Sequence, residues 1–269
     1  NVSTCVGGLY VKLADKIATR GDVERVNFDA FLDVGGHSRT QVSDLRGGGA
    51  QVAPHLPESY WAAEGVPVGG AAKRGMDIVV SLAAIIATFP LMLLIAAMIA
   101  WNGGSPIFAH ERVGYGGRRF KCFKFRTMRR DADKVLKDLL ESDPELKDAW
   151  LTHRKLRDDP RITAIGHFLR KSSLDELPQL FNVLRGEMSC VGPRPVTTEE
   201  LEYYRDYIDD YTAVRPGLTG VWQISGRSNV SMERRVRMDV DYVRSWSLAN
   251  DLLILLRTPI ELIRSKGSF

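Results

Sequence analysis

A run of 24 residues without a charged side chain, Ile78 to Trp101, constrains the fold of this chain more than any other feature. At about 1.5 Å of rise per helical residue, a helix of this length crosses the roughly 30 Å hydrocarbon core of a bilayer. A soluble protein seldom buries a helix that is so long and so uniformly apolar. The sequence therefore predicts a helix in contact with a membrane.

Pro90 lies near the middle of this run, where it removes one backbone hydrogen bond and clashes with the preceding turn. Both flanks are basic, since residues 71–130 hold ten Lys and Arg against two acidic residues. The positive-inside rule places both flanks on the cytoplasmic face, which requires the chain to bend at Pro90 and return. The residues thus favour a re-entrant helix-Pro-helix hairpin, with a kinked single span as the alternative.

The remaining pattern predicts an α+β protein in three parts. Residues 1–70 are polar and hold 11 of the 24 glycines, so we expect a partly disordered extension, with one helix suggested from Leu9 to Val34. Residues 71–104 are the re-entrant membrane helix. Residues 105–269 form a mostly helical cytosolic domain that begins with strands in Phe108–Met128 around a glycine turn and continues with a charged helical region, 131–157. Near its end, Leu248–Ile263 has the pattern of an amphipathic helix in a membrane interface, although a soluble core helix fits nearly as well.

Composition narrows the function only slightly. The net charge is +4 and the pI is about 9.0, a mild basic excess that suits phosphorylated substrates, anionic lipid or nucleic acid. Cys5, Cys122 and Cys190 lack the spacing of disulfide or zinc frameworks, and the five histidines lack metal-ligand spacing. A phosphate-binding GxxxxGK[ST] loop, a GxGxxG turn before a helix and a GxSxG serine elbow are all absent from the sequence.

The candidate chemistry centres on residues 170–180, RKSSLDELPQL. Ser173 and Glu176 have the spacing of a helix capping box, so Asp175 and Glu176 are predicted to lie in the first turn of a helix, at the positive end of its dipole. Taken alone, this pattern also fits two ordinary helix-start carboxylates.

Basic residues in constrained settings surround this pair in the sequence. Arg170 lies one turn upstream, and Arg194 is held between two prolines, while a strand carries Lys124 and Arg126 and a second turn carries Arg215. A carboxylate can bind Mg²⁺ or attack phosphorus, while cations neutralise the phosphoryl oxygens. The combination favours phosphoryl transfer.

At these residues the chain resembles the bacterial sugar transferases that act as monotopic phosphoglycosyl transferases. The matching motifs run in the family's order from about residue 71 to the end: Lys73–Asp77, Lys124–Met128, Asp158–Thr163, Ser173–Gln179, Val191–Pro195, Arg215–Gly220 and Trp222–Arg227. Within the family the resemblance is greatest to undecaprenyl-phosphate galactose phosphotransferases that initiate exopolysaccharide synthesis. Phe89 departs from the pattern, because many relatives have Ser before the hinge proline.

The resemblance implies a mechanism and a set of site residues. Asp175 would attack the β-phosphate of a UDP-sugar and release UMP, and undecaprenyl phosphate would then take the phosphosugar from the enzyme. Glu176 would assist in Mg²⁺ binding or acceptor activation, so both carboxylates are also the expected metal ligands. The remaining candidates, expected to bind phosphate or other substrate groups, are Lys124, Arg126, Arg170, Gln179, Arg194, Arg215, Trp222 and Arg227.

The resemblance also implies a re-entrant helix hinged at Pro90, with the catalytic domain and both termini at the cytoplasmic face of the inner membrane and inner-leaflet phospholipid around it. Two other functions remain open: direct Mg²⁺-assisted transfer without a covalent intermediate, and a non-catalytic scaffold of a polysaccharide machine. A nucleic-acid partner is not expected, because strands explain the interleaved phenylalanines and lysines of residues 120–125 as well as a binding surface does. The sugar and the oligomeric state are left open, with galactose favoured by resemblance alone and a homodimer as one option.

Overall fold

The computed structural model describes residues 65–101, 103–143, 146–147, 150, 156, 159–225 and 231–264. All of them belong to the second of two units into which the chain divides, Ala53–Phe269. The expected polar extension lies outside the described residues up to position 64, as does its suggested helix, Leu9–Val34.

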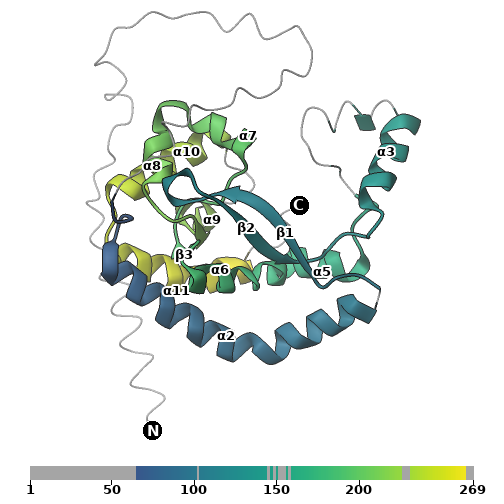
Figure 1. Cartoon of the computed structure of the whole chain (residues 1–269), viewed down its shortest axis with the longest axis horizontal. Helices are drawn as coiled ribbons and strands as arrows, with labels where there is room; N and C mark the ends of the chain where they lie inside the picture. The colour runs from purple at the N-terminus through teal and green to yellow at the C-terminus, as the bar shows by residue number, and fades with distance from the viewer. Residues whose placement is uncertain are drawn as a thin grey trace, which may run out of the picture. The chain divides into compact units, whose positions relative to one another are not determined.

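The predicted apolar helix is α2, Gly70–Trp101, which stays helical through Pro90. It is the one helix among the described residues that is long and apolar enough to cross a membrane, with a mean hydropathy of 2.7 and only 22% of its apolar window buried. A core helix of a soluble protein would be mostly buried, so the exposure supports membrane contact. Figure 1 shows that α2 is one continuous helix that bends near its middle, a shape that fits both the predicted hairpin and the kinked single span.

A β-hairpin follows the membrane helix, as the sequence predicts. Strand β1, Ile107–Val113, pairs antiparallel with β2, Arg119–Phe125, from Ile107 opposite Phe125 to Val113 opposite Arg119. The turn between them, Tyr115–Gly117, needs glycine because Gly116 and Gly117 have φ of 62° and 70°. Since side chains alternate across a strand, Phe108, His110 and Arg112 share one face with Lys124, Cys122 and Phe120.

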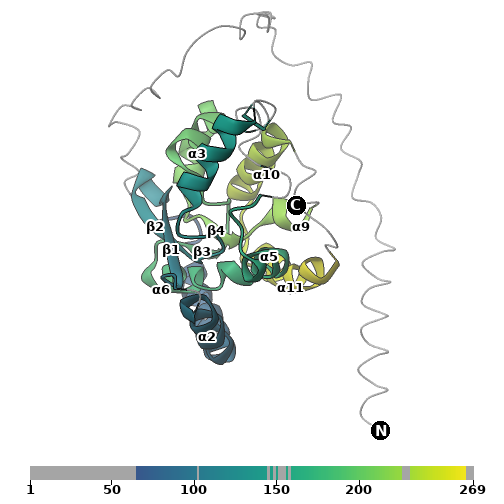
Figure 2. The same ribbon diagram turned by 90° about the vertical axis from the view of Figure 1, so that its right-hand side faces the viewer.

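The rest of the unit is mostly short helices with one further strand pair. Strands β3, Ser189–Val191, and β4, Gly217–Thr219, pair in parallel and lie between the hairpin and helices α9, α10 and α11 in Figure 2. The helices are α3 (Ala132–Ser142), α5 (Ala164–Ser172), α6 (Gln179–Arg185), α7 (Thr198–Leu201), α8 (Ile208–Thr212), α9 (Val221–Ile224), α10 (Met232–Arg244) and α11 (Leu248–Arg264). A single 3₁₀ turn, Leu174–Glu176, joins α5 to α6.

The second half of α2 packs on the hairpin and on α5. Met92, Ile95 and Ile99 form a buried apolar cluster with Phe125 and Leu169. Truncating a fully buried leucine such as Leu169 typically costs about 2–5 kcal/mol, so this cluster helps to hold α2, β2 and α5 together.

The first turns of α2 are held by buried polar contacts. The ammonium of Lys73 donates to Asp251 Oδ2 at 2.5 Å, to the Val191 carbonyl at 2.9 Å and to the Tyr242 hydroxyl at 3.1 Å. One turn later, Asp77 Oδ1 accepts from the Ser189 hydroxyl and the Cys190 amide, each at 2.9 Å. The membrane helix is therefore tied to both β3 and α11.

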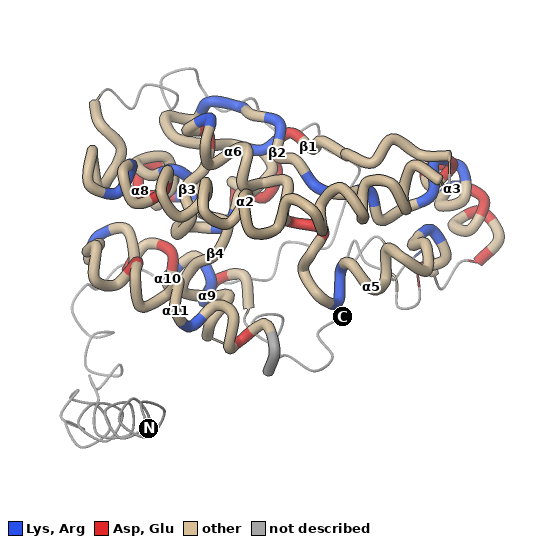
Figure 3. The backbone as a smooth tube through the Cα atoms, turned by 90° about the horizontal axis from the view of Figure 1, so that it is seen from below, with Lys and Arg blue, Asp and Glu red and all other residues tan. Residues whose placement is uncertain are grey.

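The amphipathic helix predicted at Leu248–Ile263 is confirmed as α11, Leu248–Arg264. Asp251 and Ile254 are buried, whereas Leu252, Leu253 and Leu256 are exposed. The outer face of α11 is therefore mostly apolar, with Arg257 as an exposed charged residue on it, and α2, largely tan in Figure 3, has no charged residue after Asp77. An apolar outer face suits a helix that lies in a lipid interface.

Candidate functional site

The Asp175–Glu176 pair lies where α5 ends and the chain turns. Ser173 has φ 56°, a left-handed conformation in which its amide bonds the last carbonyls of α5, and its side chain caps nothing. The predicted capping box is therefore wrong. Ser173 ends one helix, and Glu176 is drawn instead to a cation on the hairpin. Both carboxylates sit in the 3₁₀ turn before α6.

Lys124 on β2 contacts both carboxylates. Its ammonium lies 2.6 Å from Glu176 Oε1 and 3.9 Å from Asp175 Oδ2. Asp175 is only 8% exposed, and the pKa of its carboxyl is raised to about 6. Burial is the main cause, Lys124 opposes the rise, and the charge of Glu176 adds to it. A buried carboxylate of raised pKa beside a cation is typical of a catalytic nucleophile or base.

Arg170 is also brought to this group, as predicted. It lies on α5, its Nε donates to Thr127 Oγ1 at 2.9 Å, and its charge opposes the raised pKa of Asp175. Helix α5 fits tightly against this segment, since a Cβ on Gly166 would lie 2.0 Å from the Thr127 carbonyl oxygen. The close packing fixes Arg170 near the carboxylates.

A buried ion pair lies behind Arg170 that sequence reasoning did not assign to the site. Arg161 Nη2 and Asp159 Oδ2 are 2.6 Å apart, and Arg161 Nε donates to both Asp159 oxygens. Both residues fall in a motif that carries the resemblance, 158–163, which was the available signal. Asp159 raises the pKa of Arg170, and the positive charge of Arg161, its ion-pair partner, partly cancels this effect.

Arg194 belongs to a second basic group, centred on Trp222. The loop that carries Arg194 is fixed by backbone bonds, Gly192 to Thr219 at 2.9 Å and Gly217 to Pro193 at 2.7 Å. The guanidinium of Arg194 lies 5.7 Å from the centre of the Trp222 ring, and that of Arg235, on α10, lies 4.1 Å from it. Cation–π contacts of this kind hold two like charges near one buried ring.

Arg235 and Arg112 in this group were not predicted. Burial lowers the pKa of each, and the charge of the nearby Arg194 lowers both further. Arg112 pairs with Glu200 at 3.3 Å, whereas Arg194 has no acidic partner among the described residues. Arg112 shares one face of the β-hairpin with Cys122 and Lys124, and burial raises the pKa of the Cys122 thiol to about 11 while the charges of Lys124, Arg112 and Arg194 oppose the rise.

Several buried polar atoms near Trp222 lack a hydrogen-bond partner within the described part of the chain. They are Trp222 Nε1, Gln223 Oε1 and Arg235 Nε. Unpaired buried donors and acceptors cost about 1–3 kcal/mol each and are uncommon in folded proteins. Their concentration beside three arginines is the arrangement expected of a site for a polar anionic ligand.

The other predicted site residues lie elsewhere or outside the description. Arg215 donates from Nε to the Gly186 carbonyl at 2.7 Å, at the far end of α6 from Asp175. Gln179 is buried at the first residue of α6. Arg126 follows β2 and faces the end of α2, and Arg227 lies outside the described residues.

The carboxylates fit a magnesium ion of the kind that proteins share with a substrate. No group of three or more metal-ligating side chains occurs among the residues that the structure describes. Asp175 and Glu176 are adjacent and offer two carboxylates, and Mg²⁺ is usually held by one or two carboxylates together with substrate phosphates and water. The donor set therefore suits Mg²⁺ only when a phosphorylated substrate completes it.

Comparison with known proteins assigns this arrangement to a family. The chain is 50% identical over 204 residues to the exopolysaccharide production protein ExoY of Sinorhizobium fredii, covering 76% of this chain and 90% of that protein. It is 50% identical over 197 residues to the UDP-galactose-lipid carrier transferase of Erwinia amylovora and 48% identical over 197 residues to the undecaprenyl-phosphate galactose phosphotransferase of Salmonella typhimurium. Each of these alignments covers 73% of this chain and 41% of the longer relative. The bacterial sugar transferase model matches residues 68–265, and the chain therefore belongs to the bacterial sugar transferase family.

Proposed function

We propose that this enzyme transfers a hexose phosphate from a UDP-sugar to undecaprenyl phosphate at the cytoplasmic face of the inner membrane, the first membrane step of exopolysaccharide synthesis. The observation that carries the proposal is Asp175, a nearly buried carboxylate of raised pKa set beside Lys124 and Arg170. The activities for which these two relatives are named support both the acceptor and galactose as the favoured sugar.

In the first step, a carboxylate oxygen of Asp175 attacks the β-phosphorus of the donor. The bond from that phosphorus to the bridging oxygen breaks, UMP leaves with the electron pair, and the sugar phosphate is held as an acyl phosphate on Asp175. Lys124 and Arg170 supply positive charge beside the reacting phosphoryl oxygens.

In the second step, a phosphate oxygen of undecaprenyl phosphate attacks the same phosphorus. The bond to Asp175 breaks, and the product is a polyprenyl diphosphate sugar with the carboxylate regenerated. Glu176 holds Lys124 in place throughout. Asp175 and Glu176 would hold Mg²⁺, which when bound neutralises phosphate charge.

The nucleotide phosphate is assigned to the second basic group. Arg112 of this group shares one face of the β-hairpin with Lys124, which supports a single donor that contacts both groups. A bent apolar α2 and the apolar outer face of α11 keep the domain at the membrane, where the lipid acceptor is found. The bend at Pro90 allows α2 to enter and leave by the cytoplasmic face.

The test measures UMP release from a panel of UDP-sugars by the detergent-solubilised chain with Mg²⁺ and undecaprenyl phosphate. We expect release with UDP-galactose preferred, and loss of at least a thousandfold in Asp175→Asn. The matched control is Asp133→Asn, an exposed aspartate on α3, which should retain full activity.

Intact-mass measurement without acceptor separates the covalent route from direct transfer. A gain of one hexose phosphate on wild type, absent from Asp175→Asn, supports the aspartyl intermediate. Rapid UMP release that requires acceptor, with no adduct trapped at any time, would favour direct Mg²⁺-assisted transfer. If a folded chain releases no UMP from any donor, the catalytic proposal fails and a scaffold role replaces it.

A further inference from the structure

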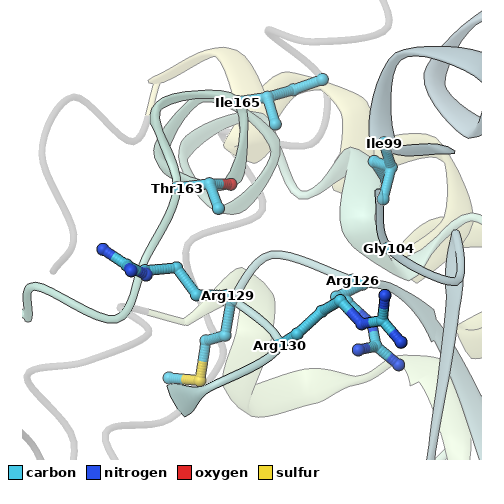
Figure 4. Close-up of a pocket in the computed structure, with 8 residues that line it drawn as sticks. Ile99, Gly104, Arg126, Arg129, Arg130, Thr163 and Ile165 are labelled. Atoms are coloured by element: carbon cyan, nitrogen blue, oxygen red, sulfur yellow. The ribbon is translucent and has the colours of Figure 1, made fainter. Parts of the chain in front are cut away.

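A small cavity of about 50 Å³ lies at the C-terminal end of α2, and neither of the two carboxylates lines it. Its walls come from Ile99 on α2, from the loop of Arg126, Arg129 and Arg130 after β2, and from Ile165 on α5 (Figure 4). The cavity therefore combines guanidinium groups with aliphatic side chains.

The positive charge around this cavity is only partly matched. Arg129 forms a two-pronged contact with Asp131, with both bonds at 3.0 Å, and Arg130 donates to the Gly103 carbonyl at 2.9 Å. Arg126 has no acidic partner among the described residues, and its Nε is buried without a hydrogen-bond acceptor. A buried N–H left unpaired costs about 1–3 kcal/mol, which an incoming anion would recover.

The cavity also lies at the level where a membrane helix meets water. Helix α2 ends at Trp101, which is 93% exposed, and tryptophan concentrates at the headgroup level of bilayers. Ile99, two residues before Trp101, is buried and lines the cavity. An anion reaching Arg126 by this route comes from the surface of the membrane.

We propose that this cavity binds the phosphate group of an anionic membrane phospholipid, with Arg126 and Arg130 as its contacts. Arginine binds phosphate through parallel hydrogen bonds, and basic pockets beside membrane helices suit lipid headgroups. Arg126 thus serves the membrane rather than the donor, and the inference does not depend on the transfer reaction. The bound lipid would hold the end of α2, the loop after β2 and the start of α5 together at the interface.

The test is lipid binding by the purified full chain in a neutral detergent, titrated with phosphatidylglycerol and read by native mass spectrometry. We expect wild type to bind phosphatidylglycerol at least tenfold more tightly than phosphatidylcholine. Arg126→Gln should weaken that binding about tenfold and Arg130→Gln about three- to fivefold, since each removes a charge-assisted contact. The matched control is Arg119→Gln, which removes an exposed arginine paired with Glu111 and should leave binding within twofold of wild type.

Two further arms decide the source of the phosphate and the role of folding. Displacement of phosphatidylglycerol by millimolar inorganic phosphate would overturn the lipid assignment in favour of a free-anion site. Arg130 is exposed, so Arg130→Gln should fold normally and keeps the test valid if Arg126→Gln is unstable. Equal loss in Arg130→Gln and Arg119→Gln, or equal affinity for the two lipids, would overturn the proposal.

Discussion

Two lysine–carboxylate pairs in this enzyme have nearly the same length and opposite surroundings. Lys73 and Asp251 are 2.5 Å apart with side chains 4% and 0% exposed, and Lys124 and Glu176 are 2.6 Å apart with side chains 29% and 33% exposed. Asp251 also accepts from the Tyr242 hydroxyl and the Trp246 indole, so its bonding is complete.

The second pair has a neighbouring carboxylate, Asp175, that is bonded less completely than Asp251. Asp175 lies 3.9 Å from Lys124, accepts no side-chain hydrogen bond among the described residues, and is buried enough to raise the pKa of its carboxyl. A fully bonded, buried pair stabilises the fold, whereas a partly exposed pair beside a carboxylate without a side-chain hydrogen bond can accept a substrate. The comparison teaches that completeness of bonding, more than distance, separates a structural ion pair from a reactive one.

The largest effect is expected from breaking the closed pair. Lys73→Met leaves Asp251 buried without its cation and should lower the free energy of unfolding by about 3–5 kcal/mol. Thermal unfolding in detergent measures this, and Lys137→Met, at an exposed pair with Glu141, should change it by under 1 kcal/mol. Adding Asp251→Asn should restore much of the loss. A single variant as stable as wild type would remove the structural half of the comparison.

Breaking the open pair should act on activity instead. Lys124→Met should change the free energy of unfolding by less than about 1 kcal/mol, because the pair is partly exposed. UMP release should fall by roughly a hundredfold through lost phosphate stabilisation. Steady-state rates and unfolding measured on the same preparation give both values. A variant whose free energy of unfolding falls well below that of wild type, while its rate of UMP release is unchanged, would contradict the comparison.

Neutralising the buried carboxylate of Asp175 should stabilise the fold. Burial raises the pKa of Asp175 from 3.8 to about 6, so its ionised form weakens the folded state above pH 6, and this penalty vanishes below about pH 4. Asp175→Asn should therefore raise the free energy of unfolding by about 1–3 kcal/mol at pH 8 and leave it unchanged at pH 4. Equal stability of the two chains at both pH values would contradict the burial of an ionised group.

The same raised pKa sets an acid limit on the rate. The attacking group is the carboxylate, so UMP release at low donor concentration should fall about tenfold per pH unit below pH 6. In Lys124→Met this limit should move to higher pH, because Lys124 lowers the pKa of Asp175. The measurement is the pH profile of kcat/KM for both chains, and an unmoved limit would mean that another group titrates.

The smallest effect concerns the second basic group. Arg235→Gln should raise KM for the donor about five- to tenfold with little change in kcat, since Arg235 is assigned to nucleotide phosphate rather than to the reacting bond. Arg237→Gln, on the same helix and exposed beside Glu233, is the matched control. Similar KM values for the two variants would show that the basic group around Trp222 does not bind the donor.

Local patterns in the sequence predicted the elements that local physics determines. The uncharged run from Ile78 to Trp101 predicted α2, and the glycines after Val113 predicted the turn of the hairpin. Asp175, Glu176, Lys124 and Arg170 were named together and do meet in the structure. Their types and motif positions carried that prediction.

The failures came where a distant partner competes with a local pattern. Ser173 and Glu176 have capping-box spacing, yet Glu176 bonds Lys124, which is 52 residues away in the chain. Arg215 donates to the Gly186 carbonyl at the end of α6, a contact that no local pattern indicates, and its role in phosphate binding stays a prediction. Lys73 and Asp251 are 178 residues apart, and no local spacing indicates that they pair. Tertiary partners of this kind require the fold.

The ion pair between Lys73 and Asp251 limits how the membrane anchor of such an enzyme can be exchanged, in evolution or in engineering. A membrane anchor joined by a simple linker can be exchanged for another without regard to the domain it carries. Here Lys73 of the anchor neutralises the buried Asp251 of α11. Asp77, also in the anchor, accepts a hydrogen bond from the backbone of β3. A chimaera that replaces α2 must keep both polar residues or neutralise their partners at the same time. The anchor and the catalytic domain therefore have to be exchanged together, although the anchor contacts lipid and the domain lies outside the bilayer.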